Sequence, residues 1–119
     1  MLSKELVAAS AKPLVLSILA EGESYGYAII QKVRTLSDGQ IAWTDGMMYP
    51  VLHRLERQKL IAAEWRKAPT GRKRKYYRLT AKGRTTLSVE RRHWMIVHTA
   101  LDTLWQRNPS LAFRRLTHG

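Results

Sequence analysis

A basic run between residues 70 and 84, TGRKRKYYRLTAKGR, holds the residue types that most clearly point to a binding chemistry. It contains seven Lys or Arg and no acid, and Tyr76 and Tyr77 stand in its middle. Clustered Lys and Arg side chains bind phosphate oxygens through charge-assisted hydrogen bonds. We therefore expect a surface that binds nucleic-acid phosphates. The plainer alternative is a solvated, flexible basic patch.

The positive charge of the whole chain is concentrated in one block. The 119 residues carry a net charge of +12. Residues 1–53 have a net charge of −1, residues 54–84 of +10 and residues 85–119 of +3. A near-neutral segment followed by one strongly basic block is typical of a domain with a single binding face. A histone-like chain would distribute its charge more evenly.

Several other classes of function are disfavoured by the composition. The chain has no cysteine, which excludes disulfides, thiolate metal sites and cysteine nucleophiles. Its histidines lack HxxxH or HExxH spacing, its acids are scattered, and no glycine-rich phosphate loop ends in Lys-Ser or Lys-Thr. We expect no enzyme, cofactor or metal. The apolar run at 13–20 is too short to span a bilayer and unlike a signal peptide, so we expect a cytoplasmic protein without a membrane partner.

The first half of the chain reads as helical. Apolar periodicity predicts a helix over 3–20, with a start or kink at Pro13 and a stop near Gly22. A second helix is predicted over 25–36, with Ser24 as its N-cap.

A short strand over 40–43 and a third helix over 46–60 are expected next. Thr44 or Asp45 would cap this helix, and Pro50 is tolerable because it lies near the first turn. The helix is apolar on one side, and on the other it carries His53, Arg54 and Arg57. That polar side is a candidate nucleic-acid surface.

Alternating residues then predict a β-hairpin with strands at 61–67 and 74–80. By alternation Tyr77 faces the core, and packing is its expected role. The basic tip would place four cations along phosphates: Arg72, Lys73, Arg74 and Lys75.

A last helix is predicted from residue 81 to about 106, with Thr80 as its cap. At about 1.5 Å per residue it would run about 39 Å, too long to bury its apolar stripe within so small a domain. We expect it to dimerise; folding back within the chain is the alternative. The stripe is made of Leu87, Trp94, Val97, Leu101 and Leu104.

Three helices, a basic hairpin and a further helix form the order of a winged helix-turn-helix, a mainly α fold with a small hairpin. We expect this domain over 1–80, a dimerisation helix over 81–107 and a tail over 108–119. In such domains the third helix enters the DNA major groove and the hairpin, or wing, lies along the neighbouring backbone.

The runs LVLSILAEGESYGYAIIQKV, DGMMYPVLHRLERQKLI and EWRKAPTGRKRKYYRLTAKGR resemble the PadR family of bacterial transcriptional regulators. The resemblance covers about residues 10 to 84. It implies a homodimeric repressor on a palindromic operator, with a single last helix as in the shorter subfamily. Met47 and Met48 depart from the family pattern: Met48 can replace a core leucine, and Met47 can change base contacts.

The resemblance also implies residue roles. The recognition-helix positions are matched by Tyr49, His53 and Arg54, and the wing positions by Lys73, Arg74 and Lys75. Tyr27 matches a position near the start of the second helix, for phosphate contact or packing. The full set of DNA-binding candidates is Tyr27, Thr44, Met47, Tyr49, His53, Arg54, Arg57, Arg72, Lys73, Arg74 and Lys75.

In this family the first and last helices build the dimer interface, which adds Leu6 and Leu14 to the expected set. Some small members bind flat aromatic drugs between tryptophans. Trp94 and Trp105 stand eleven residues apart, close to three helical turns. They are candidates for such a pocket, or they pack the dimer core.

One further reading of the basic block stays open. A nonspecific DNA- or RNA-binding protein would share the same phosphate-binding chemistry. The aromatic residues do not form an exposed stacking platform like that of single-strand binders. A membrane-surface role would need a basic amphipathic helix, whereas the densest charge here lies on a hairpin.

Overall fold

A computed structural model of the chain describes residues 2–108, 110 and 111. The structure divides into two compact units, one ending at Leu87 and the other beginning at Ser88, and each is described by itself. The tail expected over 108–119 lies mostly outside the described residues, as does Pro109.

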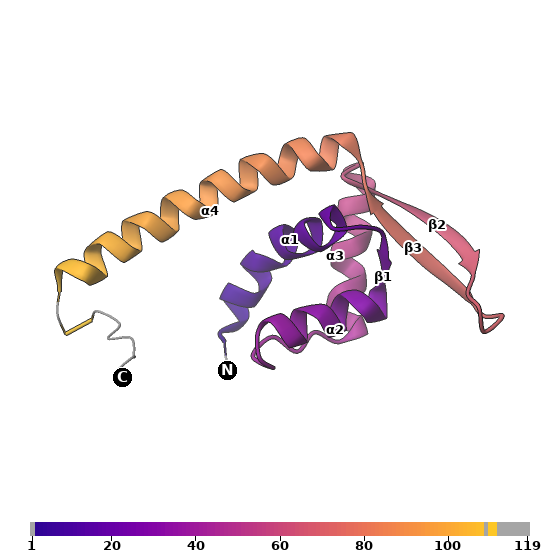
Figure 1. The fold of residues 1–119 in the computed structure, drawn as a ribbon, viewed down its shortest axis with the longest axis horizontal. Coiled ribbons are helices and arrows are strands. Elements are labelled where there is room, and N and C mark those ends of the chain that lie inside the picture. Colours follow the sequence, from indigo (N-terminus) through magenta and orange to yellow (C-terminus); the bar gives the residue numbers. More distant parts are fainter. Residues whose placement is uncertain (1, 109, 112–119) are drawn as a thin grey trace. The chain divides into compact units, whose positions relative to one another are not determined.

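The first unit contains three helices and a small antiparallel sheet, so the expected fold class is confirmed. The elements are α1 (Lys4–Ala20), β1 (Ser24–Tyr25), α2 (Gly26–Leu36), α3 (Asp45–Arg57), β2 (Ile61–Lys67), β3 (Lys73–Leu79) and α4 (Ala81–Arg107), of which α4 continues into the second unit. Strand β3 is central, because the order in the sheet is β1-β3-β2. Figure 1 shows the hairpin of β2 and β3 extending away from α1, α2 and α3.

The core of the first unit forms where the apolar faces of the three helices meet the inner face of the sheet. Met48 takes the place of a core leucine and is almost fully buried. Tyr77 points inward from β3, as strand alternation predicts, and is only 1% exposed. The other fully buried large side chains are Val15, Leu16, Ile29, Val33, Leu52, Leu55 and Ile61.

Two local predictions are wrong. Residues 40–43 form no strand, because the segment pairs with none of the described strands. Ile41 and Trp43 are buried in alternation, as they would be in a strand. Ser24 does not cap α2, because it pairs with Tyr77 as part of β1, and the N-cap residue is Tyr25, without a side-chain hydrogen bond. At Pro13 a start or a kink is expected; helix α1 does not start there but runs through Pro13 from Lys4, capped by Ser3.

Two predicted caps are confirmed. Thr44 accepts a hydrogen bond from the Met47 amide at its Oγ1 atom and starts α3. Thr80 Oγ1 accepts a hydrogen bond from the Gly83 amide (3.0 Å) and donates to the carbonyl of Lys59 (2.7 Å). The Thr80 side chain therefore both starts α4 and ties it to the turn after α3.

Gly83 allows this junction to close. A Cβ atom at residue 83 would lie 2.1 Å from the carbonyl oxygen of Leu60 and 2.6 Å from Cδ1 of Leu79. Neither distance is compatible with a side chain, so the first turn of α4 packs against Leu60 only because residue 83 has none. In the second unit, the described part of α4 is mostly exposed. None of the helices over the described residues is both long and apolar enough to cross a membrane.

Candidate nucleic-acid interface

The outer surface of α3 carries most of the predicted recognition residues. Met47, Tyr49, His53, Arg54 and Arg57 are all exposed, while the opposite side of the helix is buried in the core. The structure thus exposes the side of α3 that the apolar periodicity predicts, and this side carries Met47 among polar residues. The Thr44 side chain is engaged in capping this helix.

Basic side chains from α3 and from the hairpin meet in one place. His53 and Arg57 of α3, Lys59 of the following turn and Lys75 of β3 line an open hollow of about 460 Å³. Glu56 is the one acid in that lining, and its carboxylate lies 3.5 Å from Lys75 Nζ. Lys59 was missed by sequence reasoning, because only the fold brings it beside β3. The hollow has a strong excess of positive charge and suits a phosphate backbone.

Met47 and Arg54 lie on the other flank of α3. They border an apolar groove of about 770 Å³ that α3 forms with α1 and the segment around Trp43. The two charged residues of that groove, Lys4 and Arg54, are both cations. The structure therefore does not bring Arg54 together with His53 and Arg57 around the same hollow.

The two exposed tyrosines of the candidate set differ in their surroundings. The Tyr49 ring packs against Gly26 at the start of α2, where an added Cβ would lie 2.9 Å from its hydroxyl. This contact orients Tyr49 and joins α3 to α2. Tyr27, by contrast, is 65% exposed at the first turn of α2. The partial positive charge of a helix N-terminus favours phosphate near that position.

The tip of the hairpin is a tight turn. The Ala68 amide donates to the carbonyl of Arg72 (2.7 Å), and Gly71 has a φ of 90°, which favours glycine. Arg72 and Lys73 are exposed at the tip, whereas Arg74 and Lys75 are half-buried further along β3. The four predicted wing cations therefore form two pairs in different environments.

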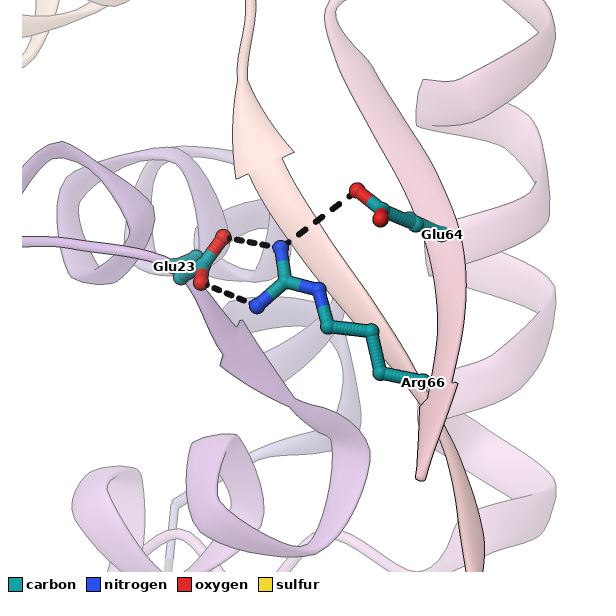
Figure 2. Close-up of polar contacts among 3 residues, drawn as sticks. All are labelled: Glu23, Glu64 and Arg66. Carbon is teal, nitrogen blue, oxygen red and sulfur yellow. Dashed lines mark hydrogen bonds and ion pairs between the residues drawn. The ribbon is translucent and has the colours of Figure 1, made fainter. Parts of the chain in front are cut away.

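Sequence reasoning missed the contacts that join the hairpin to β1. The Arg66 guanidinium donates two hydrogen bonds to the Glu23 carboxylate, and a longer one of 3.4 Å to Glu64 (Figure 2). The hydrogen bonds from Arg66 hold the pKa of Glu23 below its ordinary value. The carboxylate is therefore ionised throughout the neutral range, and the ion pair is lost only as the pH falls through that lowered pKa.

Tyr77 is confirmed as a packing residue. Burial raises the pKa of its phenol to about 12, with smaller contributions from Tyr49 and Glu56. Its buried hydroxyl has no hydrogen-bond partner in the described structure. The neutral phenol inside the sheet thus has a structural role at the base of the wing.

The predicted dimer residues are found in two environments. Leu14 and Leu87 are half-buried against the core of the first unit, whereas Leu6 is exposed. In the second unit Trp94 is 36% exposed and Trp105 half-buried. Val97, Leu101 and Leu104 of the predicted stripe are exposed, and so are two apolar residues that the heptad pattern did not include, Met95 and Ile96.

No three His, Cys, Asp or Glu side chains come together as metal ligands in the part of the chain that the structure describes. The candidate site is consequently a surface of cations, one imidazole and tyrosines around α3 and the hairpin. Such a surface can form hydrogen bonds and ion pairs with a nucleic acid.

Comparison with known proteins agrees with this geometry. Residues 15–89 match the transcriptional regulator PadR-like family. The transcriptional regulator Rv3488 of Mycobacterium tuberculosis is 35% identical over 89 residues, which are 75% of this chain and 79% of that protein.

Solved structures of regulators share the fold. A PadR-like transcriptional regulator from Bacillus cereus has a TM-score of 0.77 at 29% identity, over 87% of this chain and 98% of that one. A PadR family regulator from Eggerthella lenta has a TM-score of 0.71 at 35% identity, over 87% and 88% of the two chains. The chain therefore belongs to the PadR-like family of transcriptional regulators, which are DNA-binding proteins and not enzymes.

Proposed function

We propose that the protein is a repressor that binds a palindromic operator as a homodimer, with α3 in the major groove and the wing along the flanking backbone. The observation that carries this proposal is the cationic hollow, in which His53 and Arg57 of α3 meet Lys75 of the hairpin. Residues from two elements thereby present positive charge to one stretch of DNA. Exposed Arg72 and Lys73 extend this charge to the tip of the wing.

The homodimer is supported by an exposed apolar stripe on the part of α4 that forms the second unit. Trp94, Val97, Leu101 and Leu104 recur at spacings of three and four residues, the pattern of a helix that packs along a partner helix. The last three are more than one third exposed. A run of large apolar side chains on one exposed helix marks a protein–protein contact.

The proposal is tested by fluorescence anisotropy with a labelled duplex from upstream of this protein's own gene and a shuffled duplex. We expect a preference of about a thousandfold at physiological salt, saturating at two chains per duplex. Saturation at one chain would contradict the homodimer. Equal, steeply salt-dependent binding to duplexes from several upstream regions would instead support a nonspecific nucleic-acid-binding protein.

A small-molecule effector is a second candidate function, favoured by Trp94. This indole is partly exposed on the apolar stripe, where a flat aromatic compound could stack between two copies. We expect such a compound to quench tryptophan fluorescence saturably and to weaken DNA binding. Trp94→Leu keeps an apolar side chain at this position but removes the indole. It should therefore abolish both the saturable quenching and the effect of the compound on DNA binding. A compound panel without saturable quenching would rule against the effector, and packing of the dimer core would then be the role of Trp94.

A further inference from the structure

Five side chains connect the wing to the start of α2, and we call them the brace: Glu23, Tyr25, Arg66, Arg74 and Tyr76. Glu23 directly precedes β1, while Arg66 lies on β2, two strands away in the sheet. The Arg66 guanidinium spans this distance and donates two hydrogen bonds to Glu23, one of them 2.7 Å long (Figure 2). A bidentate pair of this kind fixes both the distance and the orientation of the elements that it joins.

Aromatic rings continue the brace across the sheet. The Arg66 guanidinium lies 4.9 Å from the centre of the Tyr76 ring. Tyr76 meets Tyr25 edge to face with ring centres 5.5 Å apart, and the Arg74 guanidinium lies 4.4 Å from the Tyr25 ring. Tyr25 and Tyr76 are also partners in the pairing of β1 with β3. All three strands of the sheet are therefore linked by side chains as well as by their backbones.

The cations of the hairpin fall into two groups, those with a partner inside the protein and those at the exposed tip. Arg66 is hydrogen-bonded to Glu23, and Arg74 lies over the Tyr25 ring. Lys75 forms an ion pair with Glu56. Arg72 and Lys73 are exposed at the tip and make no ion pair with the described residues. The tip cations are the ones placed to reach phosphate, and their direction depends on how the hairpin is held.

We propose that Glu23 is a positioning residue for DNA binding, which acts through Arg66 to fix the wing against the first turn of α2. The inference rests on the proposed role of the wing. Taken by itself, a carboxylate near DNA repels phosphate, so removing its charge should strengthen binding. If DNA binding becomes weaker when the Glu23 charge is removed, the cause must therefore be that the wing is no longer held in position. The competing possibility is that Arg66 leaves Glu23 and binds a phosphate directly.

The test compares Glu23→Gln with Glu64→Gln on the upstream and shuffled duplexes across a salt series. Both variants remove one negative charge, and both residues contact Arg66, but Glu64 makes only the long contact. We expect Glu23→Gln to bind about two- to fivefold more weakly than Glu64→Gln, the range of one exposed ion pair. The slope of log affinity against log salt should remain that of the wild type, because no phosphate contact is removed.

Two further variants complete the design. Arg66→Gln should weaken binding at least as much as Glu23→Gln, because it also removes a positive charge. The double variant, which has the wild-type net charge, should bind no more weakly than Arg66→Gln. Glu23→Asp, which keeps a carboxylate, should be intermediate. Unchanged melting temperatures would show that the variants lose DNA affinity without losing stability. Faster hydrogen exchange of β2 and β3 amides in Glu23→Gln would show that the wing has become more mobile.

The outcomes separate this inference from the proposed function. If Glu23→Gln binds as tightly as Glu64→Gln or more tightly, the brace does not position the wing. A salt slope lowered by about one unit for each bound chain in Arg66→Gln would identify Arg66 as a phosphate ligand instead. A wild type that binds both duplexes equally would contradict the operator, but the comparison of the two Gln variants still decides the brace, because phosphate contacts do not depend on sequence.

Discussion

Replacing Gly83 by alanine is expected to lower the free energy of unfolding by about 3 kcal/mol, the upper range for overpacking a closed site. The added Cβ would overlap the carbonyl oxygen of Leu60, a backbone atom that cannot rotate away. Relief requires the first turn of α4 to move, which breaks the hydrogen bonds of Thr80 to the Gly83 amide and to the Lys59 carbonyl.

Thermal unfolding followed by circular dichroism measures this effect, and a fall in melting temperature of roughly 10–20 °C is expected. Gly46→Ala is the matched control. Gly46 also lies in the first turn of a helix, but the nearest side-chain atom to its added Cβ is 3.8 Å away. That variant should be as stable as the wild type or slightly more so. Equal melting temperatures for the two alanine variants would show that the junction of Leu60 with α4 tolerates a side chain.

Removing both cations at the tip of the wing is expected to produce the largest change in DNA binding. Each phosphate that a cation neutralises adds about 0.9 to the slope of log affinity against log salt. Arg72→Ala together with Lys73→Ala should therefore lower the slope by about 1.8 for each bound chain. The corresponding loss of affinity per bound chain is about two hundredfold near 50 mM salt and about twentyfold near 200 mM.

Anisotropy titrations across a salt series check this expectation. The control variant is Lys82→Ala together with Arg84→Ala, which removes the same charge from exposed positions in the first turn of α4. Its slope should stay close to that of the wild type. Slopes that fall equally in both double variants would mean that overall charge, and not the position of the wing, determines affinity.

The features predicted correctly from the sequence depend on neighbouring residues. Alternation along β3 predicts that Tyr77 points inward, and the structure shows it buried. The caps Thr44 and Thr80 are equally local, because each bonds an amide three residues further on. The cationic side of α3 follows from helical periodicity alone.

The features that were missed depend on pairs far apart in the chain. Glu23 and Arg66 are 43 residues apart, and nothing near either residue indicates the other. Residues 40–43 alternate like a strand, but alternation reports burial and not pairing, so Ile41 and Trp43 gave a misleading signal. The need for glycine at residue 83 arises from Leu60, which lies in another turn.

The exposure of α4 has a consequence for how long the protein persists in the cell. Gly83 is the one buried residue among those described in this helix. An isolated helix of about twenty residues is marginally stable in water and opens locally. Arg91 and Arg92 are exposed in that stretch and offer cleavage sites to trypsin-like proteases. In a monomer this stretch is open to degradation, and in the proposed dimer the second copy would cover it. We therefore expect the half-life of the protein to rise with its concentration.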